Sequence, residues 1–127
     1  MIARIWHGIV SVEKADEYSR YLRETGLKDY KTTPGNKGAF LLKNSEDGYT
    51  HFIKLSFWSD MAAIKKFAGP EVEKARYYQL DSKFLTELEP YVTHYEIVEP
   101  QEDNTNPTEN EFSIQDIFFE RPILFYR

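Results

Sequence analysis

The chain has 127 residues, a net charge of −5 and no cysteine, and 16% of its residues are aromatic. A single domain of this size buries a modest core, the acidic charge argues against nucleic acid as a partner, and the absence of thiols excludes disulfides and thiolate chemistry. Since no apolar run reaches the length of a membrane span and no signal-peptide pattern opens the chain, we expect a cytoplasmic protein with no membrane partner.

Charge divides the chain into two parts. Residues 100–127 carry 6 acidic and 2 basic side chains, a charge of −4, which leaves −1 for residues 1–99. We therefore expect a globular domain over residues 1–99, followed by an acidic linker and an apolar C-terminal tail. The tail includes the run Pro122–Tyr126, which would promote aggregation if it were exposed, so we expect it to dock on the body or on a partner subunit.

Hydrophobic periodicity, capping residues and glycine or proline signals predict strands and helices in a definite order. The expected elements are strand 1–10, helix 11–25, turn 32–36, strand 39–42, hairpin loop 44–48, strand 51–57, helix 61–68, a helical stretch from 70 to 78 with a further turn from 81, and strand 91–98. Ser11 and either Ser59 or Asp60 are the expected helix caps. Gly26 and Gly69 are the expected helix ends.

This order of strand, helix, strand, strand, helix, strand predicts an α+β fold, the ferredoxin-like βαββαβ antiparallel sheet, with strand one between strands three and four. Helices then cover only one face of the sheet. Both faces nevertheless look apolar, because Trp6 and Phe52 fall on one side of their strands while Ile5 and Leu55 fall on the other. A second sheet must cover the bare face, so we expect a homodimer.

Several short segments match one known family. They are Ala3–Gly8, Tyr21–Gly26, Pro34–Asn36, His51–Phe52, Ser56–Trp58, Phe67–Gly69 and His94–Glu96. With these segments the chain resembles the antibiotic biosynthesis monooxygenase family of dimeric α/β-barrel proteins. The resemblance covers residues 1–99 and implies a dimeric barrel. The family includes cofactor-free oxygenases of aromatic polyketides, haem-degrading enzymes and quinol oxygenases.

The resemblance also bears on cofactors. The haem-degrading relatives hold iron through a histidine on the second helical stretch, but this chain has no histidine between His51 and His94, and Arg76 lies near that position. The resemblance therefore argues against haem, and we expect no cofactor. Trp58 matches the tryptophan that ends strand three in these relatives, and His7 stands about where they have an asparagine. The polyketide oxygenases share Trp58 and tyrosines of the helical stretch such as Tyr78.

All three histidines fall on expected strands that would be neighbours in the sheet. His7, His51 and His94 could gather at one edge as a proton-transfer site or a metal site, or each could satisfy a separate buried hydrogen bond. His7 and His51 lie in phase with the more apolar side of their strands, which favours that pair. Trp58 lies out of phase with the face that carries His51, so it is either a pocket wall or a tryptophan of the core or the dimer interface.

The leading hypothesis is a cofactor-independent monooxygenase-like protein that binds a small aromatic or flat apolar molecule between sheet and helices. His7 and His51 are the expected catalytic bases, and no metal is expected. The expected substrate-binding residues are Trp58, Tyr78, Tyr21 and His94. The alternatives are a non-catalytic ligand-binding or stress-responsive dimeric barrel, and an isomerase or lyase that uses the same base without oxygen.

Overall fold

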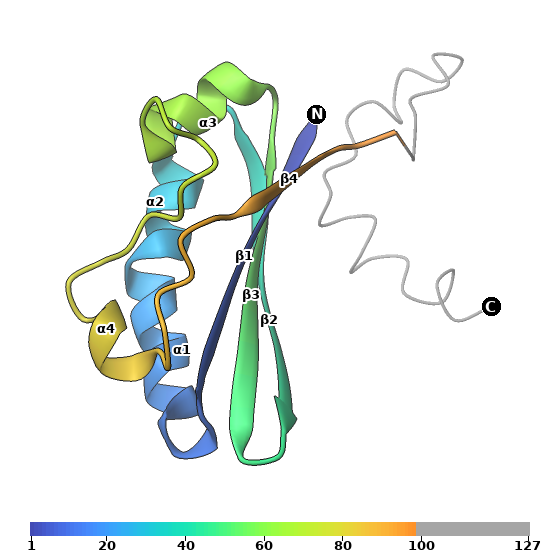
Figure 1. Cartoon of the computed structure of the whole chain (residues 1–127). Coiled ribbons are helices and arrows are strands. Elements are labelled where there is room, and N and C mark those ends of the chain that lie inside the picture. The colour runs from blue at the N-terminus through green and yellow to red at the C-terminus, as the bar shows by residue number, and fades with distance from the viewer. Residues whose placement is uncertain (99–127) are drawn as a thin grey trace.

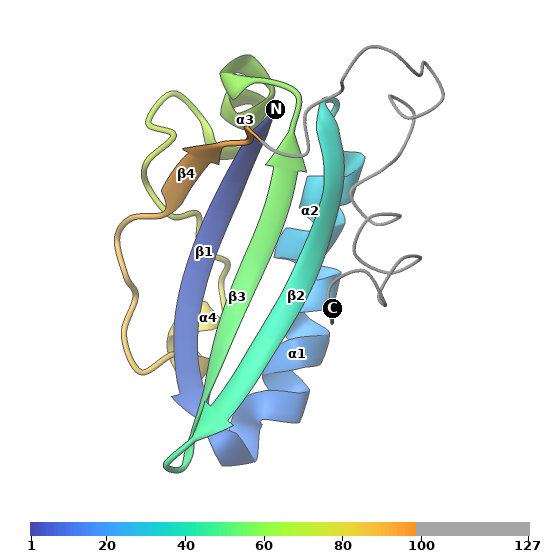
Figure 2. The same cartoon turned by 90° about the vertical axis from the view of Figure 1, so that its right-hand side faces the viewer.

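The computed structural model describes residues 1–98, and these form one antiparallel sheet with all the helices on one of its faces (Figure 1). The strands are β1 (Ile2–Ser11), β2 (Asn36–Glu46), β3 (Tyr49–Trp58) and β4 (Thr93–Glu96). Their order in the sheet is β2-β3-β1-β4, which places β1 between β3 and β4 (Figure 2). The predicted ferredoxin-like α+β order is confirmed. The expected docking of the tail concerns residues outside the described part of the chain.

The helical layer differs from the prediction at two places. The helices are the 3-10 helix η1 (Val12–Lys14) and the α-helices α1 (Ala15–Glu24), α2 (Gly26–Thr32), α3 (Met61–Ala68) and α4 (Asp81–Phe84). Gly26 was expected to end a helix, but it begins α2, so that α1 and α2 follow one another with a break at Thr25.

The second difference is that residues 70–80 do not form the predicted helix. Their backbone groups bond instead to other parts of the fold, because the Ala75 amide donates to the Pro90 carbonyl and the Val92 amide donates to the Glu73 carbonyl. The Arg4 side chain also donates to the carbonyls of Val72 and Lys74. These tertiary partners replace the helical ladder, and helical periodicity alone does not reveal them.

Side chains along β1 and β3 alternate between the two faces of the sheet, as expected for extended chains. The residues that face the helices are the more deeply buried set, and they are Arg4, Trp6, Gly8 and Val10 on β1 and Thr50, Phe52, Lys54, Ser56 and Trp58 on β3. The opposite set points to what we call the open face, and on these two strands it is Ala3, Ile5, His7, Ile9, Tyr49, His51, Ile53, Leu55 and Phe57. The prediction that both faces carry apolar side chains is confirmed.

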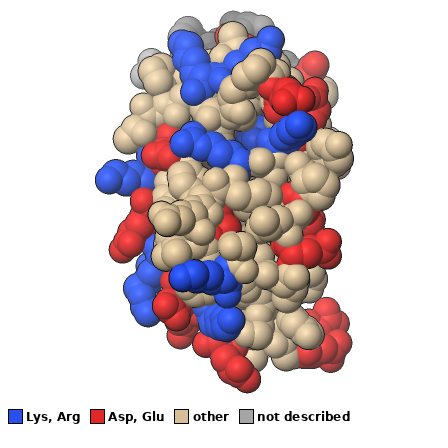
Figure 3. Space-filling view, turned by 60° about the vertical axis from the view of Figure 1, so that its left-hand side comes forward, with Lys and Arg blue, Asp and Glu red and all other residues tan. Residues whose placement is uncertain are grey.

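The outer side of the helical layer mixes both signs of charge. Figure 3 shows basic and acidic side chains close together there, with uncharged atoms between them, so this face offers no large region of one sign. No helix among residues 1–98 is long and apolar enough to cross a membrane.

Helix α3 begins and ends with the two signals that the sequence contains. Asp60 is the cap, because its Oδ1 accepts the Ala63 amide at 2.8 Å. Gly69 follows the last turn with φ of 84°, a conformation that glycine adopts without steric cost. Of the two residues expected as caps, Ser59 and Asp60, the structure selects Asp60.

We expect Asp60→Ala to lower the free energy of unfolding by about 1 kcal/mol, because the first turn of α3 loses its side-chain acceptor. Ser59→Ala is the matched control and leaves the free energy of unfolding within about 0.5 kcal/mol of the native value. Urea denaturation followed by circular dichroism measures both. A larger loss for Ser59→Ala than for Asp60→Ala would show that the cap is assigned to the wrong residue.

Candidate functional site

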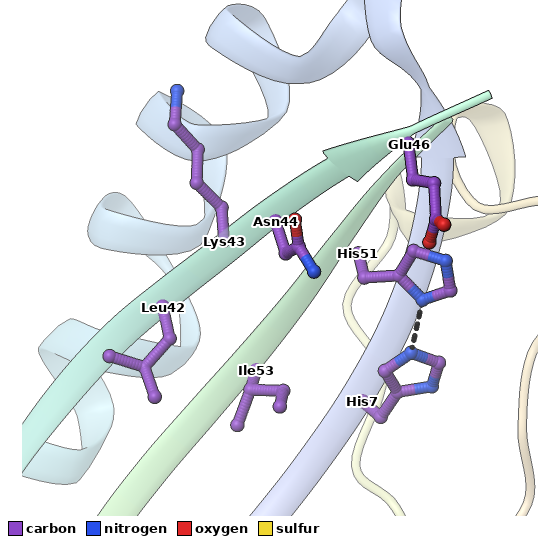
Figure 4. Close-up of a pocket in the computed structure, with 7 residues that line it drawn as sticks. All are labelled: His7, Leu42, Lys43, Asn44, Glu46, His51 and Ile53. Carbon is purple, nitrogen blue, oxygen red and sulfur yellow. Dashed lines mark hydrogen bonds between the residues drawn. The ribbon is translucent and has the colours of Figure 1, made fainter. Parts of the chain in front are cut away.

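His7 and His51 lie side by side on the open face of the sheet. His7 is opposite Ile53 and His51 is opposite Ile9, so the two imidazoles occupy diagonal positions on the neighbouring strands β1 and β3. His7 Nε2 lies 3.0 Å from His51 Nδ1, and the ring centroids are 5.2 Å apart. The two rings therefore share one hydrogen bond (Figure 4).

Glu89 extends this pair into a chain of three groups. Its Oε2 lies 2.7 Å from His7 Nδ1, and the His7 and Glu89 side chains are each about a third exposed. Glu89 precedes Pro90 in the segment that leads to β4. We call the three groups Glu89, His7 and His51 the relay.

When both imidazoles are neutral, the bonding pattern of the relay defines which ring nitrogens donate and which accept. A carboxylate only accepts, so His7 Nδ1 carries the hydrogen that points to Glu89, and a neutral His7 then has its lone pair on Nε2. That lone pair accepts from His51 Nδ1–H, which leaves the lone pair of His51 on Nε2. The relay thus places a free base at His51 Nε2, with His7 and Glu89 behind it to hold its orientation.

The base adjoins a hollow of about 320 Å³ on the open face. Apolar and polar side chains line it together, namely His7, Leu42, Lys43, Asn44, Glu46, His51 and Ile53 (Figure 4). A second hollow of about 360 Å³, lined in part by Tyr49 and Thr86, shares His51 and Glu46 with the first. His51 therefore borders both hollows, and such mixed linings are typical of small-molecule sites.

His94 lies apart from this pair. It is opposite Arg4 in the sheet, and its Nε2 lies 2.9 Å from Nη1 of Arg4, whose hydrogen it accepts. Burial, and next the positive charge of Arg4, lower the pKa of His94. The three histidines do not gather at one edge, and no group of three His, Asp or Glu side chains among residues 1–98 is placed to hold a metal ion.

Trp58 lies on the helix side of the sheet and is fully buried. Its Nε1 donates to Ser56 Oγ at 2.9 Å, and its ring packs against Tyr30 and Phe67 with centroids 5.7 and 5.9 Å away. These contacts identify Trp58 as a core residue and not as a pocket wall. It does not line either hollow beside His51.

The two tyrosines expected to bind substrate also lie away from the open face. Tyr78 donates from its hydroxyl to Asp29 Oδ2, and burial followed by that bond raises its pKa. The Tyr21 hydroxyl accepts the Leu80 amide at 2.9 Å. Both phenols therefore fasten the 70–80 segment to the helices, and neither contacts the relay.

Sequence reasoning missed three charged side chains with notable surroundings. Glu89 had no signal, because a lone glutamate before a proline is ordinary and its histidine partner is far away in the chain. Lys54 and Arg4 were also missed, although both are buried between sheet and helices with 2% and 1% of their surface exposed. Their signal was available, because each occupies an even position in a strand whose even positions are otherwise apolar or small.

Comparison with known proteins gives a likeness of fold. A structure described as an antibiotic biosynthesis monooxygenase matches with a TM-score of 0.58 and 21% identity over 77% of this chain and 99% of its own. A Nitrosomonas europaea protein, provisionally assigned to the same class, matches with a TM-score of 0.58 and 14% sequence identity. The match covers 80% of this chain and 93% of that protein. A MhuD variant with two manganese protoporphyrin IX molecules bound per active site matches with a TM-score of 0.52 and 16% sequence identity. The match covers 77% of this chain and 95% of that one.

No family model matches the chain, and no curated protein does. The structural likeness confirms the expected antibiotic-biosynthesis-monooxygenase-like fold. At these identities it extends to the fold alone.

The described residues do not fit a haem held by an imidazole from the second half of the chain. Arg76, near the expected ligand position, donates to the Phe67 carbonyl at 2.9 Å and lies over the Phe67 ring. His94 is bonded to Arg4, and the other two imidazoles lie on the open face.

The buried ammonium of Lys54 generates a prediction about stability. Burial lowers its pKa from 10.5 to about 8. Below pH 8 the lysine is charged in both the folded and the unfolded state, so the folded state bears the full free-energy cost of burying that charge. This cost decreases as the pH rises from 8 towards 10.5, because the lysine of the folded state then loses its proton first. Lys54→Met should therefore raise the free energy of unfolding at pH 7 by up to about 3 kcal/mol.

Urea denaturation at pH 7 and at pH 9 measures this effect. The native chain should become more stable relative to Lys54→Met at the higher pH, so that the difference between them shrinks. Lys66→Met, which changes an exposed lysine of α3, should leave the pH dependence unaltered. A Lys54→Met protein that is less stable than the native chain at pH 7 would contradict the assignment of a destabilising buried charge.

Proposed function

We propose that the chain binds a small flat apolar molecule in the hollow beside His51 and oxidises it with O₂ without a cofactor. The observation that carries the proposal is the relay, which presents His51 Nε2 as a base at the edge of a hollow that Leu42 and Ile53 make partly apolar. The likeness of fold to antibiotic biosynthesis monooxygenases supports the same class of reaction. The hollow lies on the open face, whereas the sequence had suggested a site between sheet and helices.

The proposed reaction begins with proton removal. His51 Nε2 takes a proton from a phenol or enol, and the proton on His51 Nδ1 passes to His7 Nε2. The positive charge then rests on His7 beside the Glu89 carboxylate, where the ion pair stabilises it. His51 is the catalytic residue in this scheme, while His7 and Glu89 are positioning residues that also accept the charge.

Oxygen then reacts with the electron-rich anion. For an anthrone-type substrate the carbanion carbon bonds to O₂ as a hydroperoxide, which recovers one proton and loses water to leave a carbonyl group. The methylene carbon is oxidised by four electrons and O₂ supplies both the carbonyl oxygen and the water oxygen, so no further reductant is needed. A hollow from which water is excluded would protect the anion from reprotonation before it meets O₂.

Substitution of the relay tests this proposal. With an anthrone or quinol that the native chain oxidises, His51→Gln should lower kcat by about 10²- to 10⁴-fold, the usual range for a general base. Glu89→Gln keeps an acceptor for His7 but loses the charge, so a smaller loss of about 10- to 100-fold is expected. An oxygen electrode measures both. His94→Gln is the matched control, because it removes the histidine on the other face and should leave the rate unchanged.

A His51→Gln protein that retains full oxygen uptake would remove His51 from the role of base. If the native chain releases a rearranged product without consuming oxygen, and His51→Gln abolishes that release, the same base serves an isomerase or lyase. A ligand that binds but is never altered would identify a binding protein instead.

We also propose that two copies of the chain pack with their open faces together. The support is the apolar open face, which none of the helices in residues 1–98 covers and on which Leu42 remains 45% exposed. Such a face is typically buried in a soluble assembly. The hollow beside His51 would then be enclosed within the dimer, which is consistent with a reaction that needs a dry site.

Sedimentation velocity at micromolar concentration should show a particle of twice the 15.0 kDa mass of one chain. Leu42→Glu introduces a charge into the proposed interface and should shift the protein towards the monomer. Val12→Glu is the control, because Val12 is also about half exposed but lies in η1, outside the sheet. A native chain that sediments as a monomer would refute the paired open faces.

A further inference from the structure

Glu89 is held from both sides of β1. Its carboxylate reaches His7 on the open face, whereas its main-chain carbonyl accepts a hydrogen bond from the Tyr77 hydroxyl at 2.5 Å. Tyr77 belongs to the helix side, where its ring meets that of Trp6 edge-on with centroids 6.3 Å apart. Because both bonds are made by one residue, the position of the carboxylate depends on where the carbonyl is held.

The main chain beside Glu89 has few other supports. It is anchored at Thr86, whose amide donates to a carbonyl of β1, and at Pro90, whose carbonyl accepts a main-chain amide. Between these two anchors, the bond from Tyr77 is the one hydrogen bond to the main chain that the structure shows within residues 1–98. Residues 86–88 are exposed, so burial does not restrain them either.

Tyr77 is itself held in place. Arg4 donates to two carbonyls of the 70–80 segment and thereby fixes the stretch of chain that carries this tyrosine. Trp6 can lie beside Tyr77 because Gly8 has no side chain, and a Cβ atom there would lie only 2.5 Å from the indole. Burial raises the pKa of Tyr77, so its hydroxyl keeps the hydrogen that it donates. Tyr77 therefore offers a fixed donor to a main chain that has few other anchors.

We propose that Tyr77 is a positioning residue of the relay, because its hydroxyl holds Glu89 where the carboxylate bonds to His7 Nδ1. The inference rests on the function proposed above, in which His51 is the base. With the carboxylate in place, a neutral His7 keeps its hydrogen on Nδ1 and its lone pair on Nε2. Without the hydroxyl, the carboxylate turns to solvent in part of the molecules, and His7 then carries its hydrogen on either nitrogen. The Nε2–H form cannot accept from His51 Nδ1–H, so those molecules lose the oriented base.

Nitrogen NMR of the imidazoles tests the inference without any substrate. Tyr77→Phe keeps the ring against Trp6 and removes only the hydroxyl. Two-bond proton–nitrogen spectra, recorded where both imidazoles are neutral, should show His7 as a single Nδ1–H tautomer in the native chain and as a mixture in Tyr77→Phe. Tyr78→Phe is the matched control, because it removes the neighbouring hydroxyl, which bonds to Asp29, and should leave the tautomer unchanged. An unchanged tautomer in Tyr77→Phe, or an equal change in Tyr78→Phe, would overturn the inference.

A double-mutant cycle shows whether Tyr77 acts through the carboxylate. Glu89→Ala alone should give the same mixture of His7 tautomers, because the acceptor is gone. Tyr77→Phe should then have no further effect in the Glu89→Ala background, since two residues that act through one contact are not additive. A further change of the tautomer in that background would assign Tyr77 a merely structural role and refute the positioning.

Kinetics separate this inference from the proposed function. With a substrate that the native chain oxidises, Tyr77→Phe should lower kcat by about fivefold, the change expected for the loss of one ordinary hydrogen bond. KM should not change, because Tyr77 lines neither hollow. A mixed tautomer with an unaltered kcat would refute the relay as the base and support the positioning by Tyr77. A single tautomer in Tyr77→Phe would refute the positioning whatever the rate.

Discussion

The alternation of side chains along β1 and β3 is the constraint on which the rest of the structure depends. Consecutive residues of these strands face opposite sides, so neighbours in sequence such as Trp6 and His7 enter different environments. Even positions enter the layer between sheet and helices, where Arg4 and Lys54 are desolvated. Odd positions enter the open face, where His7 and His51 meet. A one-residue shift in register would exchange these two chemistries.

The same alternation explains how far the sequence could predict the site. Proximity of His7 and His51 followed from strand order and phase, both of which can be inferred from local patterns. Trp58 was correctly placed out of phase with His51, yet its burial depends on Tyr30 of α2 and Phe67 of α3. Contacts between elements distant in sequence leave no local pattern, and Glu89 is the clearest example.

Local signals succeeded at one helix and failed at another. Asp60, one of two candidate caps, and the glycine after α3 were found because each satisfies its own helix end. Ser11, in contrast, makes no capping hydrogen bond with its side chain, and Gly26 begins a helix that it was expected to end. The 70–80 segment was misassigned for a different reason. Two of its carbonyls accept hydrogen bonds from Arg4, and other backbone groups of the same segment bond to residues 90 and 92. An apparently helical pattern there reflects side chains that pack on the sheet in an irregular segment.

The shortness of β4 connects the fold to the relay. β4 pairs with β1 only from Ile2 to Ile5, so the remainder of that edge of β1 is free for another partner. The chain that precedes β4 takes this place, because Leu85 bridges Val10 and the Thr86 amide donates to the Ile9 carbonyl. Glu89 follows on the same edge and reaches His7. A longer β4 would pair with β1 at His7 and displace the segment that holds the carboxylate. The interrupted edge that makes this sheet look irregular is therefore what brings an acid, 82 positions away in the chain, to the histidine pair.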